Sequence, residues 1–157
     1  MAAVWPRRRR GGRPLNPVVR SHVELMNDHR EMAYRALKRL LANGRLTAVP
    51  KRPADQELFV VLAASQIDAH RGCLESEVNE RLRIWLEAIS EPYGIDHVTL
   101  RRMLVDSGLL TRTSSGSMYQ INLAMLGEIE AVRGIEPAAV LAQVQSERDL
   151  RKRQRAT

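Results

Sequence analysis

The sequence has little of what several classes of protein require. It contains a single cysteine, Cys73, so neither an intramolecular disulfide nor a multi-cysteine zinc site can form. No apolar run approaches the ~20 residues that a membrane-spanning helix needs. The opening segment, residues 1–6, lacks the apolar core of a secretory signal. We therefore expect a cytoplasmic protein.

Aromatic residues are also scarce. They make up 4% of the 157 residues, whereas hydrophobic residues as a whole make up 44%. A core built mostly from Leu, Val, Ile, Ala and Met suits packed helices better than a β-sandwich. The length fits one domain with helical extensions.

Positive charge exceeds negative charge, with a formal net charge of +7, but the excess lies at the two ends. Residues 148–157 contain five basic residues and one acid, which leaves the body of the chain slightly acidic. Such ends either bind phosphates without regard to sequence or only improve solubility. The basic residues of the first thirteen positions, which no acid accompanies, are Arg7, Arg8, Arg9, Arg10 and Arg13.

The spacing of apolar residues and the positions of turn residues predict a mainly α protein with one small β-hairpin. The predicted fold has a winged-helix-like core, which a long N-terminal helix and C-terminal helices flank. The last helix should run from Pro137 to about Gln154. The predicted parts are a basic disordered tail (1–15), an N-terminal helical segment (16–47), a winged-helix-like domain (48–122), C-terminal helices (123–147) and a basic tail (148–157).

The N-terminal helical segment carries a wide apolar stripe over residues 17–43. Asn16 is the expected N-cap, Pro17 the first helical residue, and Asn43-Gly44 the stop. An interruption near Asn27-Asp28 would divide the segment into two helices. The stripe is wider than a coiled-coil seam, so packing on the body and pairing with a second copy both stay open. Pairing of two copies through the C-terminal helix is the other homodimer that stays open. Its apolar residues are Val18, Val19, Leu25, Met26, Met32, Ala33, Leu37, Leu40 and Leu41.

The residues with the clearest functional pattern lie on the helix predicted over 96–107 and on the hairpin after it. On a helical wheel, Thr99 and Arg102 lie opposite the apolar side, and Arg101 lies at the border. One interpretation is that these residues contact a DNA groove while Arg112 and Ser115 of the hairpin contact phosphates. In the other, Arg102 is merely solvated and Arg101 pairs with Glu77 or Glu80.

Several short motifs resemble a bacterial domain-of-unknown-function family, number 2087 in that series, over about residues 48–121. Members of the family occur alone or at the C-terminal end of predicted helix-turn-helix transcription regulators. The resemblance implies a bacterial protein with a winged-helix-like core and a link to transcription, and it carries no catalytic residues. The motifs are Glu77-Val78-Asn79-Glu80-x-Leu82, Asp96-His97, Leu100-Arg101-Arg102-x-Leu104-Val105-Asp106-x-Gly108 and Gly116-Ser117-x-Tyr119.

The function expected from these observations is DNA-associated regulation of transcription, with the basic ends adding phosphate contacts. The alternative is a protein-interaction module that docks a partner, or a second copy, through the 17–43 helix. In that alternative the basic ends bind RNA or nothing. We expect no enzymatic activity, no metal and no cofactor, because neither His22 and His29 nor His70 and Cys73 has the further groups that such chemistry needs.

Overall fold

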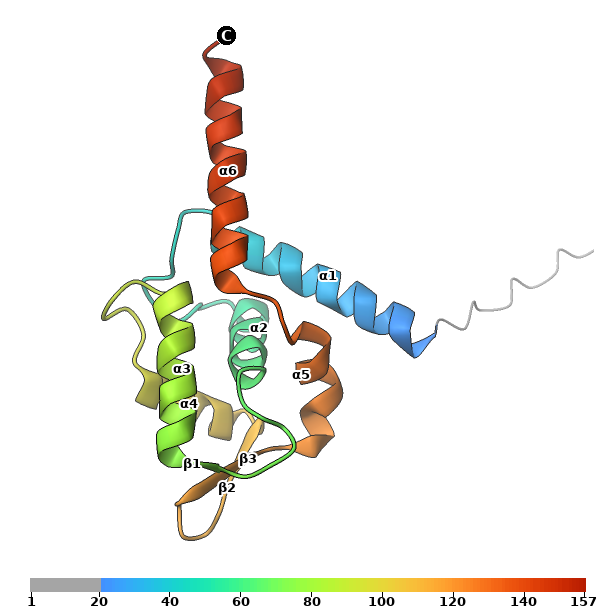
Figure 1. Ribbon diagram of the computed structural model, residues 1–157, viewed down its shortest axis with the longest axis vertical. Helices are drawn as coiled ribbons and strands as arrows, with labels where there is room; N and C mark the ends of the chain where they lie inside the picture. Colours follow the sequence, from blue (N-terminus) through green and yellow to red (C-terminus); the bar gives the residue numbers. More distant parts are fainter. Residues whose placement is uncertain (1–20) are drawn as a thin grey trace, which may run out of the picture.

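The computed structural model describes residues 21–157, and its elements confirm a mainly α fold with a small β-sheet (Figure 1). Residues 1–20, including Asn16, Pro17 and the five N-terminal arginines, lie outside the described residues. The elements are α1 (His22–Leu40), α2 (Pro53–Ala64), β1 (Cys73–Leu74), α3 (Glu75–Ile89), α4 (His97–Asp106), β2 (Leu110–Arg112), β3 (Met118–Ile121), the 3-10 helix η1 (Leu123–Met125), α5 (Leu126–Val132) and α6 (Pro137–Arg155).

Helix α1 begins at a capping box. The Ser21 hydroxyl accepts the Glu24 N–H at 3.2 Å, and the Glu24 carboxylate accepts the Ser21 N–H at 3.0 Å. The helix then runs unbroken to Leu40, so the interruption considered near Asn27-Asp28 is absent from the described residues. It ends slightly before the predicted stop at Asn43-Gly44.

The wide apolar stripe of α1 is divided between core and surface. Ala33 and Leu37 are buried where α1 crosses α5, α6 and α2. Leu25 and Met32, two turns apart on another side of the helix, are 43% and 68% exposed. Among the described residues of the predicted stripe, some therefore pack on the body while Leu25 and Met32 face solvent.

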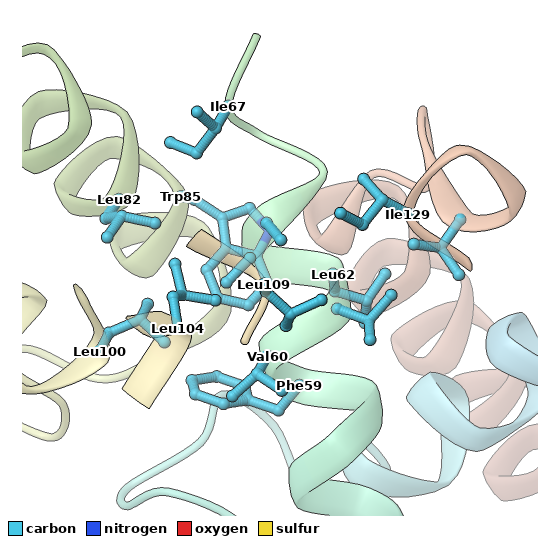
Figure 2. Close-up of a cluster of buried hydrophobic side chains, with 14 of the residues drawn as sticks. Phe59, Val60, Leu62, Ile67, Leu82, Trp85, Leu100, Leu104, Leu109 and Ile129 are labelled. Carbon is cyan, nitrogen blue, oxygen red and sulfur yellow. The ribbon is translucent and has the colours of Figure 1, made fainter. Parts of the chain in front are cut away.

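Helix α2 is the central element of the core. Its residues 59–64 are buried without interruption because α1, α4 and α5 surround it. From α3, the Trp85 ring packs against Phe59 with ring centroids 5.3 Å apart. Figure 2 shows this cluster together with Leu100 and Leu104 of α4 and Ile129 of α5. A helical segment that is apolar on every side, as residues 59–64 are, is stable only inside a protein.

The sheet has three strands in the order β1-β3-β2, all antiparallel. The predicted hairpin is present as β2 and β3, with Arg112 opposite Tyr119. Strand β1 was not predicted, and it adds Cys73 opposite Tyr119 on the other edge of β3. The chain order α2-β1-α3-α4-β2-β3 with this sheet order is winged-helix-like, with α4 in the place of the recognition helix and the β2–β3 hairpin as the wing.

Helix α6 leaves the body in a straight line, and its C-terminal end is the part of the molecule farthest from the wing in Figure 1. Its first half is seated by the buried residues Pro137, Val140 and Val144. The helix predicted from Pro137 to about Gln154 is confirmed. Most of the basic segment 148–157 is therefore helical.

Candidate nucleic-acid interface

Helix α4 is fixed to the body along one side and open on the other. The Asp96 carboxylate caps its N-terminus by accepting the Thr99 N–H at 3.2 Å. Leu100 and Leu104 are fully buried and hold the helix to the core. The outward side carries Thr99, Arg102 and Asp106, all exposed. The helix is thus anchored independently of the side chains that it presents to solvent.

Arg102 lies where the sequence placed it, on the outward side of α4. Within residues 21–157, its guanidinium has no hydrogen-bond or ion-pair partner, and the side chain is exposed. Thr99 is less free, because its hydroxyl also contacts the Asp96 carboxylate at 3.3 Å. Asp106, one turn after Arg102, lowers the positive potential at that end of the helix. The outward side therefore offers one uncommitted cation.

Arg101 is turned inward. Its side chain is 13% exposed and forms an ion pair with Glu75 at 3.1 Å. It also donates a hydrogen bond to the Asn79 side chain and lies over the Tyr119 ring, 5.6 Å from the centroid. Because these contacts join α3, α4 and β3, Arg101 holds α4 in place. We therefore leave it out of the candidate interface.

The wing presents hydroxyls and one guanidinium. Ser115 Oγ lies 3.2 Å from Thr113 Oγ1 and 2.8 Å from Ser117 Oγ, which makes a chain of exposed hydroxyls across the turn. Gly116 adopts a positive φ of 73°, and a Cβ at this position would collide with the Arg112 guanidinium. Arg112 is exposed, and its guanidinium lies 5.9 Å from the Tyr119 ring centroid. Arg112 and Ser115 are thus both accessible on the hairpin, as the sequence predicted.

Two further cations of the winged-helix core are neutralised by carboxylates. Arg71 pairs with Glu77 at 3.2 Å, and Arg83 pairs with Glu80 at 2.7 Å. The Leu74 N–H, and then Arg71, hold the pKa of the Glu77 carboxyl below its usual value. Arg102 and Arg112 are among the exposed cations of this core that have no carboxylate partner within residues 21–157.

A groove of about 730 Å³ borders the N-terminus of α4. Its walls come from the end of α3 and from the turn before α4, and they include Tyr93 and His97. Tyr93 is fully exposed and has a φ of 63°, a left-handed conformation that is costly for a residue with a side chain. No pattern in the sequence indicates this groove.

Residues 45–121 match the model of a bacterial family, DUF2087, described as an uncharacterized protein conserved in bacteria. The resemblance stated from the sequence over about 48–121 is thereby confirmed. The matched segment contains α2 to β3, which is the whole winged-helix core, while α1, α5 and α6 lie outside it. Neither a curated protein nor a solved structure matches the chain.

The structure explains part of the motif that carries the resemblance. Asn79, Arg101 and Tyr119 all belong to it, and they meet in the contact network that joins α3, α4 and β3.

Within residues 21–157, no group of three or more His, Cys, Asp or Glu is arranged to hold a metal ion. None of the helices of that part of the chain is long and apolar enough to cross a bilayer.

Proposed function

We propose that this protein binds duplex DNA through α4 and the wing and acts as a bacterial transcription regulator. One observation carries the proposal. Within residues 21–157, the winged-helix order of elements leaves Arg102 exposed and unpaired on the outward side of α4, and it leaves Arg112 exposed on the wing that follows α4 in the chain. In winged-helix and helix-turn-helix proteins, the corresponding helix enters the major groove.

The accessible residues suggest separate roles in such a complex. Arg102 has the planar donor fork that pairs with the O6 and N7 atoms of guanine, and Thr99 lies one turn before it for a second base or phosphate contact. Arg112 and Ser115 supply a cation and a hydroxyl for the phosphates next to the groove. Arg101 acts by positioning α4. Arg7, Arg8, Arg9, Arg10 and Arg13 would add phosphate contacts that are independent of sequence.

A binding experiment with matched variants tests this proposal. The Arg102→Ala/Arg112→Ala variant should lose selection of a preferred site from a random duplex library, measured by fluorescence anisotropy on the selected duplex. Loss of a base contact should weaken that site by ~1–3 kcal/mol while non-specific binding persists. Arg81→Ala is a suitable control, because Arg81 is exposed and lines cavities on the α5–α6 side of α3 together with Arg133.

Unchanged site selection by the double variant would refute the proposed interface. Equal weakening by Arg81→Ala would also count against it, because the effect would then follow net charge alone. Single-stranded RNA of the same sequence, added as a competitor, should displace the duplex poorly if α4 occupies a major groove. Stronger competition by RNA would favour the alternative in which the basic ends bind RNA.

A second candidate function rests on the exposed apolar side of α1. Leu25 and Met32 lie two turns apart on α1, with 43% and 68% of their surfaces exposed to solvent, and pairing would remove this apolar surface from water. We infer that this side of α1 pairs with a second copy of the chain. Sedimentation over a concentration series should show a dimer that Leu25→Asp/Met32→Asp converts to a monomer with an unchanged helical content. A monomer at all concentrations would exclude this pairing.

A further inference from the structure

Helix α6 carries a single stripe that changes character along its length. The stripe begins with three buried residues, Pro137, Val140 and Val144, that seat the helix on the body. The same helical spacing of three and four residues continues through Arg148, Arg151 and Arg155, with Lys152 beside them. We call these four side chains the basic face of α6. The stripe thus passes from apolar to basic at the point where the helix leaves the body.

The basic face of α6 takes little part in holding the fold together. In the part of the chain that the structure describes, none of its four cations forms an ion pair. Two contacts near its base fix the direction of the helix, namely the Lys38–Glu147 ion pair at 2.9 Å and the hydrogen bond from Arg148 to the Ala42 carbonyl at 3.4 Å. Beyond Val144 the helix contains no buried residue. At 1.5 Å per residue, this outer part is ~16 Å long.

The chemistry of this face favours a polyanion with regularly spaced phosphates. Guanidinium groups bind phosphate oxygens in a bidentate manner, and residues three or four apart on a helix lie about 5–6 Å from each other. A membrane-surface helix would instead need a broad apolar side, and the outer half of α6 has one large apolar residue, Leu150. A nucleic-acid backbone fits the face better than a lipid surface does.

The position of the basic face of α6 matters as much as its charge. Figure 1 shows the outer end of α6 at one extreme of the long axis and the wing at the other. Duplex DNA is stiff over about 150 base pairs, so a duplex that crosses α4 and the wing at an angle to the long axis stays away from the outer end of α6. Bending it back would cost several kcal/mol. A duplex in that orientation therefore leaves the basic face of α6 open to another duplex.

From the basic face and its position, we propose that α6 binds a second duplex, so that one chain bridges two DNA segments. The inference rests on the proposed function, since one of the two duplexes is bound by α4 and the wing. The bridge needs no second copy of the protein. Its two contacts have different character, because the α6 contact is made to phosphates and should be independent of sequence.

Bridging can be measured with the full chain and two 30-base-pair duplexes. One duplex is held on beads, the other is fluorescent, and capture of the fluorescent duplex reports bridging. The Arg151→Ala/Lys152→Ala/Arg155→Ala variant should lose at least ~10-fold of the capture and still bind a single duplex at its preferred site. Its salt dependence should flatten by about 0.9 in log K per log salt for each phosphate contact removed. No core residue is changed, so its thermal midpoint should equal that of the unmodified chain.

A charge-matched control is available on the body. Arg35→Ala/Lys51→Ala/Arg81→Ala removes the same net charge from exposed side chains, and it should capture the second duplex as the unmodified chain does. Equal loss in this control would overturn the proposal, because bulk charge would then explain the capture. Full capture by the α6 variant would also overturn it, and would indicate bridging by a dimer with two α4 surfaces.

The failure of the bridge and the failure of the proposed function are distinguishable. If single-duplex binding ignores Arg102→Ala/Arg112→Ala but disappears in the α6 variant, then α6 is the sole site and both proposals fail. If single-duplex binding depends on Arg102 and Arg112 and no second duplex is captured, the bridge alone fails. Competition by polyglutamate as effective as by duplex DNA would assign the basic face of α6 to acidic protein and would also refute the bridge.

Discussion

Neighbouring residues of α4 have opposite environments, and their substitution should separate stability from binding. Leu104→Ala should lower the free energy of unfolding by ~2–5 kcal/mol, because it empties a fully buried site. Arg102→Ala should change it by no more than about 0.5 kcal/mol, as expected at an exposed and unpaired position. Urea unfolding of both variants measures the difference. A large loss in Arg102→Ala would show that this side chain supports the fold.

The contact between Arg101 and Glu75 can be tested by a double-mutant cycle. The guanidinium is largely shielded from solvent and pairs with a carboxylate from another helix. We expect a coupling free energy of ~0.5–3 kcal/mol between Arg101→Ala and Glu75→Ala. The same cycle with Arg102→Ala in place of Arg101→Ala should give a coupling near zero. Equal coupling in the two cycles would contradict the assignment of Arg101 as a positioning residue.

Helical periodicity predicted which side of α4 each arginine occupies, but it did not predict the partner of Arg101. The wheel placed Arg102 outward and Arg101 at the border, and the structure agrees. The partner of Arg101 was expected to be Glu77 or Glu80, whereas the structure pairs it with Glu75. The crossing geometry of α3 and α4 decides which turn of α3 faces Arg101, and no local pattern encodes that geometry. Glu77 is engaged elsewhere, by the Leu74 N–H and by Arg71.

At the scale of the element, the N-cap of α4 should make its stability depend on pH. The Thr99 N–H, as the main cause, holds the pKa of Asp96 below its ordinary value of 3.8. A depressed pKa in the folded state means that this carboxylate stabilises the fold above pH 3.8. That stabilisation is lost as the pH falls below 3.8 through the folded-state pKa.

Asp96→Ala should therefore cost ~0.5–2 kcal/mol at pH 7 and progressively less in acid. Asp96→Asn retains an acceptor for the Thr99 N–H but cannot titrate, so it should remove this pH dependence without the full loss of the cap. Thermal midpoints at pH 7 and pH 2.5 for the three proteins measure both effects. A constant difference between the unmodified chain and Asp96→Ala across this range would show that the carboxylate charge plays no part.

Element boundaries were predictable where one residue determines them. Asp96 and Gly108 mark the two ends of α4 by capping and by a positive φ of 78°, and both were located from the sequence. Strand β1 was missed because Cys73-Leu74 is too short to show an alternating pattern. It is a strand only through its pairing with Tyr119 and Met118, which lie more than forty residues later. Whether each side of α1 is buried or exposed could not be predicted for the same reason, because burial depends on elements that lie far away in the sequence.

At the scale of the whole molecule, the segment that matches the family model should depend for its stability on the helices that surround it. Residues 45–121 include the apolar helix α2 but not α1 or α5, which cover two of its sides. A fragment of residues 45–121 should therefore melt well below the full chain and bind a dye specific for exposed apolar surface. A fragment of residues 45–136 restores α5 and should recover part of the stability. Equal melting of the shorter fragment and the full chain would show that the core is self-sufficient.

The central place of α2 also has a consequence for synthesis on the ribosome. Helix α2 is complete at residue 64, but its α5 cover is complete only at residue 132. At about 5–20 residues per second, this apolar helix leaves the exit tunnel several seconds before its cover is made. During that interval the nascent chain exposes a surface that ribosome-associated chaperones bind. Among the described helices, α2 is thus the segment for which co-translational protection matters most.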